Sequence, residues 1–199
     1  MSEVPELSEA ANLPLRLRTA TGAAHRRLER DLDLLREPLD RVRITGLLTR
    51  FWGFHAAWEP AVRRHLALDS LMVGRYRLHL LSRDLAELGM SQQDIAALPR
   101  CEPAGELALP LASAWGSLYV MEGSVLGGKI ISKALENTAW APPGGLQYFD
   151  PHGSTTGLMW RRFKDALGAA ASPTGDPAIV LGAQCTFDLL RSWLVDGIG

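Results

Sequence analysis

The chain has 199 residues, of which 47% are hydrophobic and 22% charged, and its formal net charge is -1. This length and apolar content suit one globular domain with a sizeable core. A near-neutral chain has no broad basic field to attract nucleic acid or an anionic membrane surface. The sequence also lacks an uncharged run of 18 residues. We therefore expect a protein that neither spans a membrane nor binds nucleic acid.

The first segment, residues 1–12 (MSEVPELSEAAN), is acidic and has neither the basic start nor the apolar run of a secretory signal. We expect it to be a disordered tail, followed by a single helical domain over residues 13–199. The two cysteines, Cys101 and Cys185, belong to no C-x-x-C or C-x-x-H pattern. Two unpaired thiols are typical of the reducing cytoplasm, so the predicted location is cytoplasmic.

Apolar residues recur at three- and four-residue steps through the first half of the chain, which predicts amphipathic helices. The first helix is expected over residues 13–30, with a proline in its first turn. A second, over residues 40–67, is expected to bend at Pro60. A third over residues 70–88 and a short fourth over residues 92–98 follow.

The second half opens with a predicted loop over residues 100–106, and a long helix is expected over residues 109–137. Residues 138–153 are rich in proline and glycine and predict a long connection. No segment alternates as a strand does, so the predicted fold class is all-α, a bundle of about seven helices. Its last two helices are expected after Ser154 or Thr155 and over residues 178–195, with Asp176 and Pro177 as cap and first turn.

The long helix carries four glycines in the stretch WGSLYVMEGSVLGGKIISK, and each costs about 1 kcal/mol relative to alanine in a helix interior. Gly116, Gly123 and Gly127 are seven and four residues apart, so they share one face and leave bare backbone there. Gly128 widens this strip. Two occupants fit such a face: a neighbouring helix that approaches closely, or a flat ligand pressed onto the backbone.

Most catalytic motifs are absent from the sequence. There is no G-x-S-x-G, no phosphate-binding loop and no H-E-x-x-H. Four histidines, His55, His65, His79 and His152, are interpreted as structural or surface residues. His25 differs because Glu29 lies one helical turn away and can accept the ring N–H that a metal ligand leaves free. The alternative for this pair is a solvated contact worth a few tenths of a kcal/mol.

A histidine ligand opposite a bare helix face is the arrangement that haem requires when one side of its iron must remain open to O2. Four segments, LRLRTATGAAHRRLE, YVMEGSVLGGKII, MWRRFKDAL and CTFDLLRSWL, occur here in an order and at separations that resemble the haem oxygenases. The bacterial, biliverdin-forming members associated with bacteriophytochromes are the most similar in pattern. The resemblance extends from Leu13 to Leu194.

The resemblance implies that haem lies between a proximal helix and the glycine-rich distal helix. His25 would be the proximal iron ligand and Glu29 its hydrogen-bonded partner, with Gly123, Gly127 and Gly128 on the distal side. Ser124 occupies the position at which the mammalian enzymes place an aspartate that organises water around O2, which leaves the proton-delivery group open, with Glu122 as one candidate. The residues implied to contact the propionates are Arg18, Tyr119 and Arg161, the last with Arg162 and Lys164 adjacent.

The implied reaction cleaves haem at a meso carbon with O2 and external electrons, giving biliverdin, CO and iron. No flavin or nicotinamide fingerprint is present, so the electron donor would be a separate ferredoxin or reductase. A bacteriophytochrome is a possible recipient of the biliverdin. Three alternatives remain open: a non-catalytic haem carrier or sensor, a thiaminase-like hydrolase on the same fold, and a helical interaction module.

Overall fold

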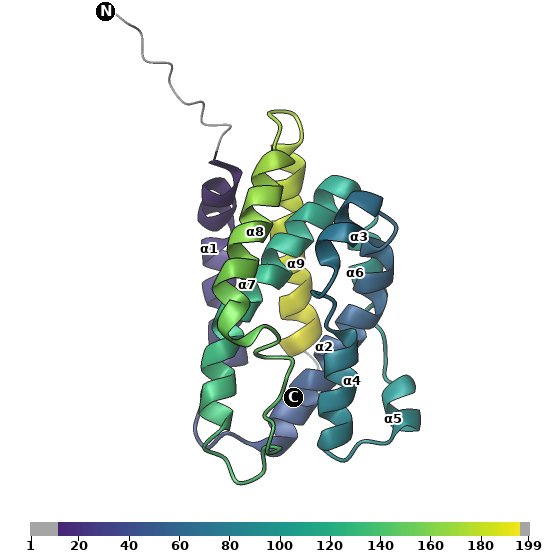
Figure 1. Ribbon diagram of the computed structural model, residues 1–199, viewed down its shortest axis with the longest axis vertical. Helices are drawn as coiled ribbons and strands as arrows, with labels where there is room; N and C mark the ends of the chain where they lie inside the picture. Colours follow the sequence, from purple (N-terminus) through teal and green to yellow (C-terminus); the bar gives the residue numbers. More distant parts are fainter. Residues whose placement is uncertain (1–11, 196–199) are drawn as a thin grey trace, which may run out of the picture.

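The computed structural model describes residues 12–195, and within this range the chain forms α-helices, one short 3-10 turn and no strand (Figure 1). The all-α prediction is confirmed. The predicted disordered tail lies outside the described residues, apart from Asn12. The elements are α1 (Leu13–Leu32), α2 (Arg41–Val62), α3 (Leu66–Met72), α4 (Leu78–Glu87), α5 (Gln92–Ala96), α6 (Glu102–Leu107), α7 (Leu111–Leu135), η2 (Gly153–Thr155), α8 (Thr156–Ala169) and α9 (Asp176–Val195).

The helix ends follow local capping chemistry. Asn12 accepts a hydrogen bond from the Leu15 backbone N–H at the start of α1, where Pro14 fits because it needs no N–H partner. Asp40 accepts from two backbone N–H groups in the first turn of α2. Ser91 caps α5 by accepting from the Asp94 N–H. These caps set the start of each element close to its predicted position.

Three predictions about residues 40–106 are corrected. Residues 70–88 are not one helix, because α3 ends at Met72 and α4 begins at Leu78. Gly74 adopts a φ of 73° between them, the Arg75 side chain pairs with buried Glu122, and buried Glu59 accepts the Arg77 backbone N–H. The helix from Asp40 ends at Val62, two residues after Pro60, and does not reach Ala67. The predicted loop 100–106 instead contains α6, so the described residues hold nine α-helices rather than about seven.

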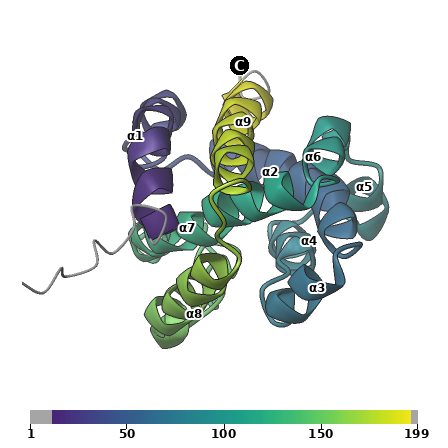
Figure 2. The same cartoon turned by 90° about the horizontal axis from the view of Figure 1, so that it is seen from above.

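The centre of the molecule is the contact between α7 and α9 (Figure 2). A Cβ atom on Gly116 would lie 2.2 Å from the Ile179 carbonyl oxygen, and one on Gly182 would lie 2.6 Å from the Ser113 Cα. A glycine on each helix therefore lets the two backbones touch. α9 is long and apolar enough to span a membrane by length and composition alone. Its contacts with α1, α2, α6 and α7 are those of a core helix.

Helix α1 packs on α9 and in part on α8, and it lies at the edge of the bundle on the left in Figure 1. Leu13 and Leu17 are fully buried in this contact. Two ion pairs link α1 to α9, from Arg16 to Asp176 at 2.8 Å and from Arg191 to Asp31 at 2.5 Å. Helix α7 does not fill the space beside the middle of α1, and a cavity separates them there.

Candidate functional site

A cavity of about 890 Å³ lies between α1 and α7. This volume is within the range of about 300–1,000 Å³ that small-molecule sites usually have. Helices α8 and α9 and a loop segment before α8 close it. The residues around it are predominantly apolar. Its lining residues with polar or charged side chains are Arg18, Thr21, His25, Arg26, Glu29, Asp33, Arg77, Tyr119, Ser124 and Tyr148.

His25 is the imidazole on the α1 wall. Its Nδ1 lies 3.3 Å from Glu29 Oε2, and the edge of its ring meets Phe187 of α9 at 5.6 Å between centroids. The side chain remains 52% exposed. Because Nδ1 is engaged by the carboxylate, Nε2 is the nitrogen left for a metal. The structure thus brings His25 and Glu29 together at the cavity, as the sequence predicted.

The facing wall is the middle of α7, where two glycines leave the backbone open. A Cβ on Gly127 would meet nothing within 4 Å, and one on Gly123 would approach only the Trp160 ring, at 3.8 Å. Both glycines line the cavity. Bare backbone on this side leaves room for a flat molecule and for a small ligand between that molecule and α7.

The four glycines of α7 do not act alike, which refines the prediction of one shared bare face. Gly116 serves the α7–α9 contact described above. Gly128 is buried, and a Cβ there would lie 2.3 Å from the Phe149 carbonyl oxygen. A neighbouring helix therefore takes Gly116 and a loop backbone contacts Gly128, which also lines the cavity, while Gly123 and Gly127 remain open for a ligand.

Cationic and phenolic groups gather where α1 and α7 approach α8. Arg18, Thr21 and Tyr119 all line this part of the cavity. Burial raises the pKa of Tyr119, against smaller opposing effects of Thr21 and Arg18. Arg161 is exposed on α8 and is not among the cavity-lining residues. Of the three residues implied to contact propionates, the structure brings two together.

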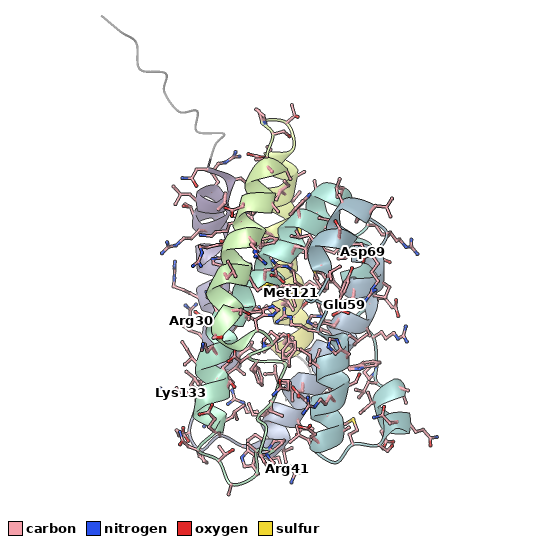
Figure 3. The ribbon with its side chains drawn as sticks, viewed as in Figure 1. Arg30, Arg41, Glu59, Asp69, Met121 and Lys133 are labelled. Carbon is pink, nitrogen blue, oxygen red and sulfur yellow. The ribbon has the colours of Figure 1, made fainter. Side chains whose placement is uncertain are left out.

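A buried polar network, which the sequence did not predict, borders the cavity beside α7. Arg77 donates to the Met121 carbonyl oxygen at 2.7 Å and to Ser124 Oγ at 3.4 Å, and its guanidinium lies over the Tyr148 ring. Its backbone N–H donates to Glu59 Oε1 at 2.7 Å. Figure 3 shows Met121 and Glu59 near the centre of the molecule. Glu122 forms a buried ion pair with Arg75 and is not among the residues lining the cavity.

His55 belongs to the same network. It is fully buried, with Nδ1 2.9 Å from Glu59 Oε1 and Nε2 3.3 Å from the Tyr148 hydroxyl. Burial lowers the pKa of His55 and outweighs the raising effect of Glu59. The structural role predicted for His55 is thus consistent with its position, but its link to the cavity through Tyr148 was missed. The spacing to Glu59 was the available signal, since it equals that from His25 to Glu29.

These residues fit haem. The cavity has two extended walls. One carries His25, whose Nδ1 is engaged by Glu29, and the other is the open backbone at Gly123 and Gly127. No cluster of three or more potential metal ligands occurs in residues 12–195. A single axial histidine is sufficient when the porphyrin supplies the other ligands of the iron.

The fold and this cavity define an all-α protein built to hold a flat, iron-centred ligand between two helices. The sequence matches the model of one family, described as Heme oxygenase, over residues 11–196. The chain therefore belongs to the haem oxygenase family, which comprises oxidoreductases.

Individual haem oxygenases are similar to this chain in sequence or in fold. A haem oxygenase of Xanthomonas campestris pv. campestris (strain 8004) is 36% identical over 119 residues, which span 57% of this chain and 64% of that relative. The haem oxygenase structure from Leptospira interrogans has a TM-score of 0.78 at 18% identity and covers 95% of this chain and 100% of its own. The NO- and CO-bound haem oxygenase of Neisseria meningitidis has a TM-score of 0.74 at 22% identity, covering 94% and 92%. Haem oxygenase-2 of Synechocystis sp. PCC 6803, in complex with haem and NO, has a TM-score of 0.78 at 18% identity, covering 93% and 84%.

Proposed function

We propose that this protein binds haem between α1 and α7 and cleaves it at a meso carbon, consuming O2 and electrons from an external donor and releasing biliverdin, CO and iron. The observation that carries the proposal is the opposition of His25, held by Glu29, to the open backbone at Gly123 and Gly127. Haem, when bound, supplies the redox-active iron and is itself the molecule cleaved.

Each wall has a separate task in this proposal. His25 would ligate the iron through Nε2, with Glu29 fixing the tautomer and orientation of the ring. Gly123 and Gly127 would admit O2 on the other face without a bulky neighbour. Arg18 and Tyr119 would meet the propionates, with Arg161 a further candidate outside the cavity lining.

Proton delivery is assigned to the polar groups on the α7 side. The Ser124 hydroxyl donates to the Met121 carbonyl oxygen at 2.7 Å and accepts from the Arg77 guanidinium. A hydroxyl next to a buried cation can hold water against the distal face of the ring. Ser124 can thus take over the water-organising role, without the aspartate of the mammalian enzymes. Glu122 is a weaker candidate because Arg75 already holds its carboxylate.

The remaining partners follow from the reaction and from the resemblance. A ferredoxin or reductase would supply the electrons, and a bacteriophytochrome stays a predicted recipient of biliverdin. Cys101 and Cys185 are both free thiols in the structure. We accordingly place the protein in the reducing cytoplasm.

A single optical experiment tests the proposal. Hemin is titrated into the purified protein, and ascorbate is then added in air, with catalase present so that free peroxide cannot degrade the haem. We expect a Soret band that saturates at one equivalent of hemin. After ascorbate is added, this band should disappear while a broad red absorption grows, and the product should co-elute with biliverdin. A Soret band that persists under reductant and air would identify a haem carrier or sensor instead.

Two controls make the result specific. Omitting ascorbate should leave the haem intact. The substitution Gly127→Leu places a branched side chain on the open wall and should slow cleavage more than it weakens hemin binding. Equal cleavage by this variant would contradict the role given to the bare backbone.

A further inference from the structure

One end of the cavity is closed by a loop segment, Leu146–Phe149, which we call the strap. It belongs to the connection between α7 and α8, yet Leu146, Tyr148 and Phe149 are each less than 5% exposed. Tyr148 and Phe149 line the cavity. Loops usually run over the surface, because a buried loop must find partners for its backbone polar groups. The strap must therefore be held by something specific.

The residue that holds the strap is Asp84 of α4. Its side chain is fully buried, with Oδ1 accepting the Gln147 backbone N–H at 2.9 Å and Oδ2 accepting the Tyr148 N–H at 2.8 Å. No cation in the described residues forms a salt bridge with it, since neighbouring Arg83 pairs with Glu87. Burial raises the pKa of Asp84 to about 6, against the lowering effect of the two N–H groups. Burying a carboxylate is costly unless it is hydrogen-bonded, and both hydrogen bonds of Asp84 go to the strap. We therefore take holding the strap to be its structural role.

The strap also rests on α7 at a position shaped for it. The Phe149 carbonyl oxygen lies 2.3 Å from the position that a Cβ on Gly128 would take, so only glycine admits the strap at this distance. Gly128 is nine residues beyond Tyr119, or about 13 Å along the helix. The strap therefore forms part of the wall at the end of the cavity away from Arg18 and Tyr119, where Leu34 and Leu35 also line it.

Aromatic contacts make this wall rigid. The Tyr148 ring lies 5.0 Å from that of Phe51 and 5.5 Å from that of Phe149, between centroids. Its hydroxyl reaches His55, and Arg77 lies over its face. A ring whose propionates meet Arg18 would direct its opposite edge toward this wall. Moving the wall would change how deeply the haem ring enters the cavity and how it is rotated in its own plane.

We propose that Asp84 is a positioning residue that fixes the strap as the end wall of the pocket and so sets the in-plane seating of haem and the meso carbon that is cleaved. This rests on the proposed function for the choice of ligand. Asp84 touches neither ligand nor iron and acts through the backbone of Gln147 and Tyr148.

The test compares Asp84→Asn with Glu87→Gln, an exposed carboxylate on the same helix. Asparagine keeps the shape but replaces one acceptor oxygen with an N–H donor that opposes a backbone N–H. In the protein without haem, amide exchange at Gln147 and Tyr148 should accelerate at least tenfold in Asp84→Asn and remain unchanged in Glu87→Gln. Unchanged exchange in Asp84→Asn would overturn the anchoring.

Haem seating is read from the methyl proton resonances of the cyanide complex with ferric hemin, which need no turnover. We expect a second set of resonances in Asp84→Asn and the wild-type set alone in Glu87→Gln. The ratio of biliverdin isomers should shift at least threefold in parallel. Faster exchange with unchanged resonances and isomers would overturn the proposal, because the strap would then be structural only.

Two further measurements separate a failure of this proposal from a failure of the proposed function. Gly128→Ala displaces the strap from the α7 side without touching Asp84, so it should alter the same resonances if Asp84→Asn fails to fold. A wild-type protein that binds hemin without cleaving it would contradict the proposed function, while the resonances would still decide the role of Asp84. No hemin binding at all would overturn both.

Discussion

Two imidazole–carboxylate pairs with the same four-residue spacing lie on consecutive helices of the chain, α1 and α2. On α1, His25 and Glu29 have side chains that are 52% and 63% exposed, and their contact is 3.3 Å. On α2, His55 and Glu59 are 0% and 5% exposed, and theirs is 2.9 Å. The first pair leaves one ring nitrogen for a ligand, whereas the second has both ring nitrogens engaged by the protein.

The difference between the pairs lies in what surrounds them. Glu59 also accepts the backbone N–H groups of Arg77 and Leu78, which start α4. Burial would raise the pKa of Glu59, but the hydrogen bond and charge of His55 and these two N–H groups bring it below its usual value. The α2 pair therefore organises the fold, while the α1 pair faces the cavity. Spacing alone identifies neither role.

The largest expected effect is on stability. Glu59→Ala removes the acceptor of His55 and of two backbone N–H groups, and breaking a buried pair in this way costs about 3–5 kcal/mol. We expect that loss in the free energy of unfolding, measured with urea in the absence of haem. Glu29→Ala is the matched variant from the exposed pair, and it should change the same quantity by less than about 0.5 kcal/mol. Similar losses of unfolding free energy in both variants would mean that the two pairs do not differ in their contribution to stability.

The next effect is on ligand binding. His25→Ala should weaken hemin binding about 100-fold, equivalent to about 2.7 kcal/mol, because the axial ligand is lost. Added imidazole should restore the ligated spectrum, since the cavity would still admit a free ring. His55→Gln should leave hemin affinity within a few-fold of wild type. Hemin bound equally well by His25→Ala would show that the ligand comes from elsewhere.

Acid stability should report on the α2 pair. Because burial lowers the pKa of His55 below its ordinary value of 6.5, the neutral ring favours the folded state. Its contribution is present above pH 6.5 and is lost as the pH falls through the lowered pKa. Asp84, with a pKa raised to about 6, acts in the opposite sense.

The difference between wild type and His55→Gln isolates the histidine, because Asp84 is common to both. Unfolding free energies measured between pH 5 and 8 should fall more steeply toward acid in wild type than in this variant. If the curves of unfolding free energy against pH were parallel for wild type and His55→Gln, the lowered pKa assigned to His55 would be contradicted.

The smallest expected effect concerns Glu29. Glu29→Gln keeps a hydrogen-bonding partner for His25 but removes the charge, and the pair is well exposed to solvent. We expect a change of only a few-fold in hemin affinity, below the 10–100-fold typical of buried partners of metal ligands. Resonance Raman spectra of the ferrous complex should show a lower iron–histidine stretching frequency. An unchanged frequency would mean that Glu29 does not act on the ring.

The elements that local sequence determines were predicted well. The periodicity of Leu17, Thr21 and Leu28 places one face of α1 inward, and all three are buried. The long glycine-containing helix is present as α7, from Leu111 to Leu135. The break between α3 and α4 was missed because it depends on distant carboxylates: Glu122 binds the Arg75 side chain and Glu59 accepts the Arg77 backbone N–H. A periodicity pattern does not show such contacts.

The same limit applies to the site. Gly116 and Gly127 are the same residue type on the same helix, and only the packing of α9 against the first shows that the second is free for a ligand. Arg77 and Tyr148 join the site through contacts across 44 and 93 residues of chain. No local pattern contains such contacts. The sequence therefore predicted the ligand wall more fully than the network behind it.

The attachment of α1 has a consequence for the energetics of turnover. Since α1 is held by α9 and α8 and meets α7 across the cavity, a bound apolar ring would itself become core between the two helices. Ligand at 100 times its dissociation constant would raise the free energy of unfolding by about 2.7 kcal/mol. Opening the ring and freeing its iron would remove the bond to His25 and part of that core. Product release and the loosening of α1 would then be one thermodynamic event.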